Sequence, residues 1–202
     1  MTGIIDYGSG NLRSVFNAFR YLGEDVRICD DPDCLGSVDK IVLPGVGSSK
    51  DALAGLSQRG LVEPLLRRIQ EGRLFLGICL GLQMLFDSSE EAGGCDCLKV
   101  VRGDVRLFPG GEGLKVPQIG WNTVKMAEGK CPLFEGIEDS SYFYFVHSYY
   151  CENEESELTA GRTEYGVTYT SALWKENIYA VQFHPERSQK NGLKLLKNFV
   201  RL

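Results

Sequence analysis

Short apolar segments alternate with helical patterns through the first half of the chain. The strand-like segments are 2–7, 25–29, 40–45 and 73–79, and the first of them ends in a Gly/Ser turn at 8–10. The helical segments are 11–23, 49–72 and 80–88, and the second of them is broken near Gly60. Strands that are apolar throughout and are connected by helices are typical of a parallel sheet covered on both faces. The first half therefore predicts an α/β fold.

The pattern changes after residue 95. Shorter strand-like segments are separated by Gly-rich or acidic turns, which favours mixed or antiparallel pairing: 98–108, 121–126, 142–150, 157–162 and 165–181. A helix over 191–202 closes the chain. No linker, repeat or low-complexity tract interrupts it, so we predict one domain over 1–202. Catalytic residues are expected on loops at the carboxyl ends of its strands.

Charge and hydropathy exclude several classes of partner. The net charge is 22 − 27 = −5 and no dense basic run occurs, which argues against binding to nucleic acid or to an anionic membrane surface. No apolar run approaches the roughly 20 residues that span a bilayer. The start, "MTGIIDYGSGN", lacks the basic region of a signal peptide. We expect a cytoplasmic protein with no membrane partner.

Seven cysteines are present, at irregular spacing. The odd number argues against a disulfide framework and for a reducing compartment. Cys95 and Cys97 form a C-x-C pair, but no second pair or nearby histidine completes a zinc site. We therefore predict surface or loop thiols there, and neither a metal nor a cofactor for the chain.

One cysteine lies at the junction of a strand and a helix. In "GICLG" (77–81), glycines stand two residues before and two after Cys79. Small residues at those positions are typical of a nucleophile elbow, where a tight turn holds the central residue in a strained, exposed position. A thiol at a helix N-terminus is also stabilised as thiolate. The alternative is a buried cysteine with incidental glycines.

A nucleophilic cysteine generally needs a base, and the chain has two histidines. His184 lies in "AVQFHPERS", where Glu186 points to the same side of an extended backbone and can fix the imidazole tautomer. The alternative for H-P-E is a strand-end turn with a solvated acid. His147 lies in the aromatic segment "YFVHSYY", where a structural histidine is at least as plausible as a base.

Acyl transfer also needs hydrogen-bond donors for the developing oxyanion. The stretch "LPGVGSS" (43–49) follows a predicted strand and can offer the backbone N–H of Val46 or Gly47, beside that of Leu80. A phosphate cradle or a plain turn would have a similar sequence. A Walker motif is excluded, because no Gly-Lys-Ser/Thr follows.

Taken together and in this order, "LPGVG", "GICLGLQ", "YFVHSY" and "VQFHPERS" closely resemble class I (triad-type) glutamine amidotransferases, over essentially the whole chain. Within that superfamily, "DYGSGNLRSV" and "KVPQIGWN" look most like the glutaminase subunit of imidazole glycerol phosphate synthase, an enzyme of histidine biosynthesis. The resemblance implies a mixed, mostly parallel central sheet with helices on both faces and a strained strand–turn–helix elbow.

The resemblance also implies roles for individual residues. Cys79 would attack the side-chain amide of glutamine, while His184 moves the proton and Glu186 orients it. Backbone groups of Val46, Gly47 and Leu80 would form the oxyanion hole. The amino-acid end of glutamine would be held by four residues: Gln83, Glu91, Ser148 and Tyr149.

A partner is implied as well, because free ammonia would be lost to water as ammonium. In this family the glutaminase forms a heterodimer with a (β/α)₈ cyclase, receives its activating signal from the cyclase ligand, and passes ammonia through the barrel. Four residues match positions at that junction: Asn11, Trp121, Asn122 and Tyr144. Trp121 and Tyr144 could equally be core aromatics.

Three departures from the family pattern stand out. Gln118 replaces an expected histidine near the docking face, Arg187 replaces a lysine, and "PGVGSSKDA" lacks an aromatic residue after the loop. Gln118 keeps open a paralogous glutaminase that supplies ammonia for surface-polysaccharide sugars. A non-catalytic subunit is disfavoured, because Cys79, His184 and Glu186 are all present. A Cys–His–Glu hydrolase acting on peptides is a further alternative.

Overall fold

The computed structural model describes residues 1–8, 11–111, 113–128 and 131–202. Its centre is a parallel sheet of five strands, in the order β2 (Val26–Cys29), β1 (Thr2–Ile5), β3 (Lys40–Gly45), β4 (Leu74–Cys79) and β13 (Ile178–Val181). The turn expected after the first strand includes Ser9 and Gly10, which lie outside the described residues. The predicted parallel sheet is confirmed.

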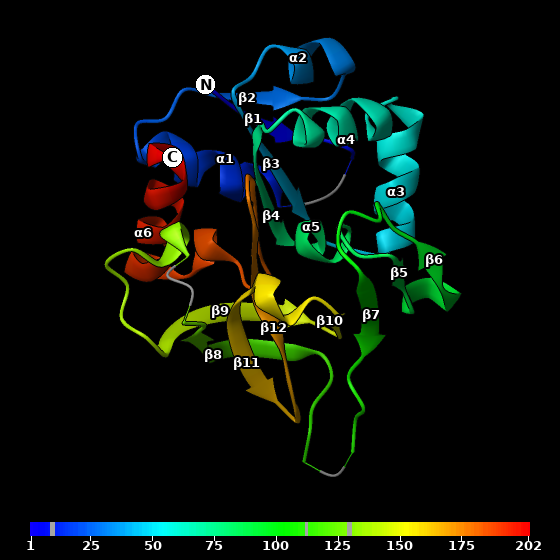
Figure 1. Cartoon of the computed structure of the whole chain (residues 1–202), viewed down its shortest axis with the longest axis vertical. Coiled ribbons are helices and arrows are strands. Elements are labelled where there is room, and N and C mark those ends of the chain that lie inside the picture. The colour runs from blue at the N-terminus through cyan, green and yellow to red at the C-terminus, as the bar shows by residue number, and fades with distance from the viewer. Residues whose placement is uncertain (9–10, 112, 129–130) are drawn as a thin grey trace.

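Helices cover both faces of this sheet (Figure 1). On one face lie α1 (Leu12–Tyr21) and α6 (Gln189–Arg201); on the other lie α3 (Ser49–Gln58) and α4 (Val62–Gln70), with α2 (Pro32–Gly36) next to β2. Successive side chains of β3 explain the arrangement: Val42 packs in the α1–α6 core, and Leu43 packs in the α3–α4 core. Alternation along a strand thus supplies two hydrophobic layers from one apolar segment.

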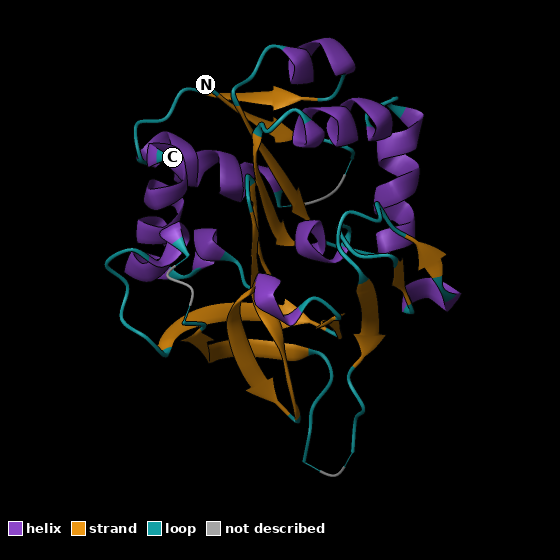
Figure 2. Cartoon of the chain, viewed as in Figure 1, coloured by secondary structure: helices purple, strands orange, loops and turns teal. Residues whose placement is uncertain are grey.

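Further strands, most of them antiparallel to their neighbours, lie below the helices (Figure 2). The sheet continues from β13 through β12 (Val167–Lys175), β10 (Tyr149–Asn153), β7 (Gly103–Leu107), β5 (Ser88–Ser89) and β6 (Cys95–Asp96). A branch runs from β12 through β11 (Thr159–Tyr165) and β8 (Gln118–Met126) to β9 (Ser141–His147). Four 3₁₀ turns complete the described elements: η1 (Glu91–Gly93), η2 (Pro132–Phe134), η3 (Ser156–Leu158) and η4 (Pro185–Arg187).

Several predicted elements have different boundaries in the structure; the segment predicted as one strand over 142–150, for example, is split between β9 and β10. The helix predicted over 80–88 is only α5 (Leu80–Gln83), because carbonyls that would continue it accept bonds from a distant segment: Leu98 N–H donates to Met84 O, and Val100 N–H to Leu85 O. The segment predicted as a strand over 165–181 is two strands. β13 turns back antiparallel to β12 and pairs on its other side with β4, to which it is parallel.

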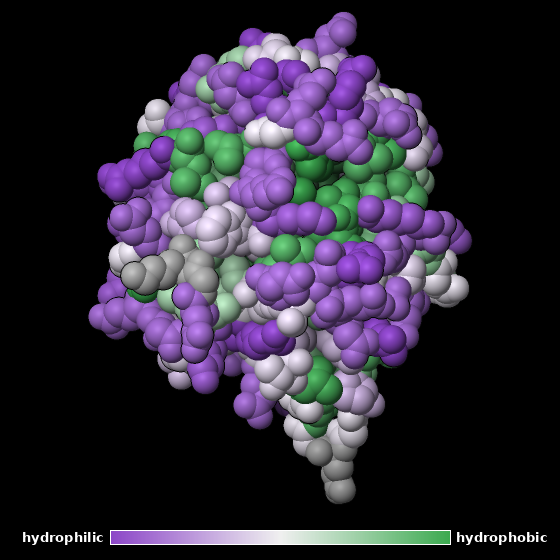
Figure 3. Space-filling model, in the orientation of Figure 1, coloured by the Kyte–Doolittle hydropathy of each residue, from purple (hydrophilic) through white to green (hydrophobic). Residues whose placement is uncertain are grey.

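The cysteines differ in part from the expected free thiols. Cys29 and Cys34 are disulfide-bonded between the end of β2 and α2, whereas the other five are free. Cys97 is buried, but it lies in the loop after β6, which agrees with the expectation of a surface or loop thiol. Hydrophilic side chains dominate the face shown in Figure 3. None of the helices in the described part of the chain is both long and apolar enough to cross a membrane.

Candidate active site

The turn from β4 into α5 is as tight as the glycine spacing predicted. A Cβ added to Gly77 would lie 2.5 Å from the carbonyl oxygen of Gly81, and a Cβ on Gly81 would lie 1.9 Å from that of Leu43. Between them Cys79 has φ 55° and ψ −105°, a conformation that costs a non-glycine residue about 1–3 kcal/mol. The glycines are therefore required sterically, and the strained elbow is confirmed.

Strand register brings the other segments to the elbow. Gly45 of β3 is the partner of Cys79, so the loop that starts at Val46 begins beside the cysteine. On the other side of β4, Val181 of β13 pairs with Ile78, which places the next residues, Gln182 to His184, beside the same turn. The carboxyl ends of parallel strands lie at one edge of a sheet, and the residues of the candidate site meet at this edge.

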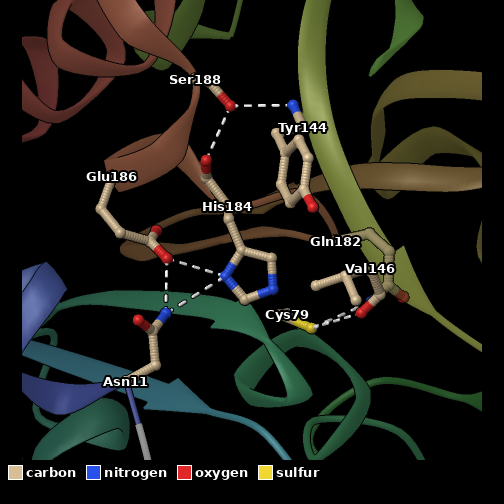
Figure 4. Close-up of polar contacts among 8 residues, drawn as sticks. All are labelled: Asn11, Cys79, Tyr144, Val146, Gln182, His184, Glu186 and Ser188. Atoms are coloured by element: carbon tan, nitrogen blue, oxygen red, sulfur yellow. Dashed lines mark hydrogen bonds and ion pairs between the residues drawn. The ribbon is translucent and has the colours of Figure 1, made fainter. Parts of the chain in front are cut away.

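His184 and Glu186 form a buried pair (Figure 4). The Nδ1–H of His184 donates to Glu186 Oε1 at 2.8 Å, and the side chains are 2% and 0% exposed. Asn11 Nδ2 donates to the same carboxylate oxygen at 2.6 Å. Because a carboxylate only accepts, Nδ1 keeps its proton, and Nε2 is the nitrogen that exchanges one. Nε2 has no hydrogen-bond partner among the described residues, and the ring lies between Glu186 and Cys79.

The charge state of His184 follows from its neighbours. Burial alone lowers its pKa, but the nearby charges of Cys79 and Glu186 and the hydrogen bond to Glu186 outweigh burial and raise the pKa to about 10. At neutral pH the ring is therefore an imidazolium next to the cysteine. An imidazolium in this place can protonate a group that leaves from the neighbouring sulfur's substrate.

His147 lies in a different kind of site. Its Nδ1 donates to the carbonyl of Tyr149 at 2.7 Å, and its Nε2 lies 3.2 Å from the hydroxyl of Tyr169, which also bonds Gln118. Burial lowers the pKa of His147 to about 4, against the backbone hydrogen bond that raises it. With both nitrogens bonded and the ring neutral, His147 is a structural residue.

A cavity of about 290 Å³ opens over Cys79. It brings together all the residues that the sequence assigned to the oxyanion hole and to glutamine, with four further neighbours. Its lining residues are Val46, Gly47, Cys79, Leu80, Gln83, Glu91, Pro117, Val146, His147, Ser148 and Tyr149. Asn11, Trp121, Asn122 and Tyr144 do not line it.

Two polar residues of the cavity are held by the backbone. Glu91 is half-buried and accepts the N–H of Ser49 at 2.8 Å, while burial raises the pKa of its carboxyl. Gln83 is 4% exposed, and its Nε2 donates to the carbonyl of Tyr149 at 3.0 Å. The carboxylate of Glu91 and the free Oε1 of Gln83 are acceptors of the kind that an ammonium group needs.

The sulfur of Cys79 has two polar neighbours that the sequence did not indicate. The Nε2 of Gln182 lies 3.7 Å from Sγ, and the carbonyl oxygen of Val146 lies 4.0 Å from it. Both residues lie on apolar strands or at their ends, where the sequence pattern predicts buried core residues. For Gln182 a signal existed, because an amide in the middle of "AVQFHPE" interrupts an otherwise apolar strand end.

The residues assigned to the partner junction divide into two groups. Trp121 and Tyr144 are strand partners with rings 6.0 Å apart, and Trp121 is 46% exposed, so it is not a core aromatic. The Nδ2 of Asn122 donates to the carbonyl of Glu164. Asn11 contacts His184 and Glu186. Its side chain therefore has a place beside this pair in addition to the predicted place at the partner junction.

Gln118 also differs from its expected position. Its side chain is 3% exposed and bonds Tyr169, inside the His147 network. It does not face outward as a docking residue would. Arg187, in contrast, is exposed. Among the described residues no group of three or more His, Cys, Asp or Glu could hold a metal ion.

Comparison with known proteins agrees with this geometry. The model of the family "Glutamine amidotransferase class-I" matches residues 3–202. An "Imidazole glycerol phosphate synthase subunit HisH" of Methanothermobacter thermautotrophicus is 50% identical over 202 residues, covering 100% of this chain and 98% of that protein. The subunit of the same name from Syntrophotalea carbinolica is 48% identical, covering 98% of both.

Solved structures show the same fold at low identity. A structure titled "Crystal structure of glutamine amidotransferase" has a TM-score of 0.77 and 18% identity, and covers 99% of this chain and 97% of that one. "Structure of PurLQS from Thermotoga maritima" has a TM-score of 0.78 at 17% identity, with the same coverage. The predicted fold is therefore confirmed.

Proposed function

Because this chain belongs to the class I glutamine amidotransferase family, we propose that it is the glutaminase subunit of an imidazole glycerol phosphate synthase, in histidine biosynthesis. It hydrolyses glutamine to glutamate and ammonia. The observation that carries the assignment is the Cys79–His184–Glu186 constellation, of which Cys79 lines the cavity. The names of its relatives favour this function over the polysaccharide alternative.

The first half-reaction begins with the Cys79 thiolate. Its sulfur attacks the carboxamide carbon of glutamine, and backbone N–H groups of Val46 or Gly47 and of Leu80 stabilise the oxyanion. The carbon–nitrogen bond then breaks, and His184 Nε2–H gives its proton to the leaving nitrogen. The products of this step are ammonia and a γ-glutamyl thioester on Cys79.

The second half-reaction returns the enzyme to its starting state. His184, now neutral at Nε2, takes a proton from water, and the water oxygen attacks the thioester carbon. The carbon–sulfur bond breaks, the electron pair returns to sulfur, and glutamate leaves. Glu186 and its donor Asn11 keep the imidazole oriented throughout, because Nδ1–H is bonded to the carboxylate in both states.

The amino-acid end of glutamine is held by Glu91, Gln83 and the Ser148–Tyr149 segment. Glu91 can pair with the ammonium, and the backbone of Ser148 and Tyr149 lies on the wall of the cavity. These roles follow from position in the cavity and from charge. We propose the cytoplasm as the location, because Cys79 must remain a reduced thiol; the disulfide joins only Cys29 and Cys34.

The ammonia is consumed by a cyclase, and we propose a heterodimer with a (β/α)₈ cyclase subunit. The outer face of β8 and β9 supports this. Ile119 is 63% exposed, Trp121 46% and Tyr142 59%, so large apolar side chains gather on one surface. A surface of this kind is typical of a protein interface.

The decisive experiment mixes the chain with a verified active cyclase and its nucleotide ligand, and measures glutamate release. We expect release with the wild type and none with Cys79→Ala, which should still bind the cyclase. No glutamate from the wild-type mixture would contradict the proposed function. Turnover by the Cys79→Ala variant would exclude the thiol mechanism.

A further inference from the structure

Gln182 is a buried residue whose side chain reaches Cys79, beside Val146 of β9 (Figure 4). It follows β13 directly, its backbone N–H donates to the carbonyl of Ser171 at 2.9 Å, and none of its surface is exposed. Its side-chain Nε2 lies 3.7 Å from Cys79 Sγ (Figure 4). A buried amide is costly unless it is hydrogen-bonded, so its contacts define what it does.

The neighbours of this amide fix which end faces the sulfur. Gln83 Nε2 donates to the carbonyl of Tyr149 at 3.0 Å, and a carbonyl cannot donate, so the nitrogen of Gln83 must lie there. The same nitrogen lies 3.2 Å from Gln182 Oε1, which therefore accepts.

A second donor holds the same oxygen. The thiol of Cys151 donates to Gln182 Oε1 at 3.9 Å, and burial raises the pKa of Cys151 well above its ordinary value, so that it stays a thiol. With its oxygen held by Gln83 and Cys151, Gln182 presents its N–H to Cys79. The orientation follows from the network and does not depend on one contact.

The two polar neighbours of Sγ act differently on its two protonation states. The carbonyl of Val146, 4.0 Å away, can accept from a thiol but repels a thiolate. The N–H of Gln182 attracts a thiolate more strongly than a thiol, because hydrogen bonds to charged groups are stronger than neutral ones. Cys79 is only 6% exposed, so water replaces that donor poorly.

We propose that Gln182 is a further member of the catalytic centre, which donates an N–H hydrogen bond to the Cys79 thiolate and is itself held by Gln83 from the wall of the glutamine site. The inference rests on the proposed function, because it takes Cys79 as the nucleophile. When sulfur attacks, its electron pair moves to carbon and the N–H bond to it weakens. When the thioester is hydrolysed, the pair returns to sulfur and Gln182 stabilises the leaving thiolate.

The test measures the thiolate without any partner or substrate. Iodoacetamide alkylates thiolates, and mass spectrometry of the Cys79 peptide gives the rate as a function of pH in the isolated full chain. Gln182→Met has a similar length and no N–H. We expect the midpoint of its alkylation curve to rise by about one pH unit, with alkylation roughly ten-fold slower below the midpoint.

Gln118→Met is the matched control, because Gln118 is also a buried glutamine but bonds Tyr169 and not Cys79. It should keep the wild-type curve. Gln182→Asn retains an amide and withdraws it from sulfur by one carbon, so it should show the same shift and replaces the Met variant if circular dichroism shows that variant unfolded.

Two results would decide against the inference. A wild-type alkylation curve in a folded Gln182→Met or Gln182→Asn variant overturns it, and so does an equal shift in Gln118→Met. Failure of the proposed function is a separate outcome. It would show as no glutamate release by the wild type with an active cyclase, whereas the alkylation curves of the isolated chain still decide the role of Gln182.

Discussion

The two histidines of this chain are both buried, yet their environments move the pKa in opposite directions. His184 is 1% exposed and His147 is 7% exposed. The pKa of His184 is raised to about 10, because Cys79 and Glu186 overcome the effect of burial. The pKa of His147 is lowered to about 4, because burial outweighs the hydrogen bond to the Tyr149 carbonyl and the charge of His184 lowers the pKa further. Burial alone therefore does not identify a base; the charges within reach of the ring do.

Their positions in the sheet explain why the charges differ. His184 follows the carboxyl end of β13, where the parallel strands deliver a nucleophile and an acid to one edge. His147 ends β9, between the aromatic rings of Phe108, Phe145 and Tyr169. A proton shuttle needs one free nitrogen, and only His184 has one. The difference predicts that His184 transfers protons and His147 is structural, and mutations of the two residues can test this.

The largest expected effect is the loss of activity in His184→Ala. Removing the proton-transfer group should lower glutamate release by the cyclase complex by roughly 10³-fold or more. His147→Ala is the comparison, and it should retain a measurable part of the activity. The measurement is glutamate release at saturating glutamine, after both variants are shown to be folded by circular dichroism. Equal and complete losses in the two variants would refute the choice of base.

A smaller effect is expected in the pH dependence of stability. The folded pKa of His147, about 4, is below its unfolded value near 6.5, so the unfolded state binds the proton first as the pH falls. Stability should therefore drop between pH 6.5 and about 4, by about 3 kcal/mol in all, and reach its full value above pH 6.5. His184 should act in the opposite sense. Its folded pKa is raised, so its contribution is present below pH 6.5 and is lost as the pH rises towards about 10.

Urea unfolding of the wild type and of each Ala variant at a series of pH values tests this pair. Subtracting the free energy of unfolding of each variant from that of the wild type at every pH removes the contribution of the groups that the two proteins share. The difference curve for His147 should rise with pH, and that for His184 should fall. Two curves of the same sign would show that burial, and not the neighbouring charges, sets both pKa values.

The sequence predicted the elements that local sterics determine. The glycines around Cys79 indicated the elbow, and the structure shows the clashes that make them necessary. The H-P-E stretch indicated the His184–Glu186 pair, although the 3₁₀ turn Pro185–Arg187 brings the two side chains together and not the extended backbone that the prediction assumed. The alternation of apolar segments and helices predicted the parallel sheet.

The sequence did not indicate contacts that depend on long-range pairing. Helix α5 stops early because Leu98 and Val100 occupy its next carbonyls, and no local signal marks that competition. The parallel pairing of β13 with β4 brings Gln182 to Cys79 across 103 residues. Asn11 reaches Glu186 in the same way. Such partners are set by topology, and local sequence patterns do not reveal them.

The smallest expected effect concerns the hydroxyl that links His147 to Gln118. Tyr169→Phe removes it and leaves two buried polar groups without that partner, which should lower the free energy of unfolding by about 1–2 kcal/mol. Glutamate release should change by less than about three-fold, because His147 takes no proton in the reaction. Tyr165→Phe is the control, since the hydroxyl of Tyr165 bonds the carbonyl of Lys115 in a more exposed place and should cost less than about 1 kcal/mol. A large loss of activity in Tyr169→Phe with unchanged stability would mean that the His147 network takes part in catalysis, and the contrast between the two histidines would fail.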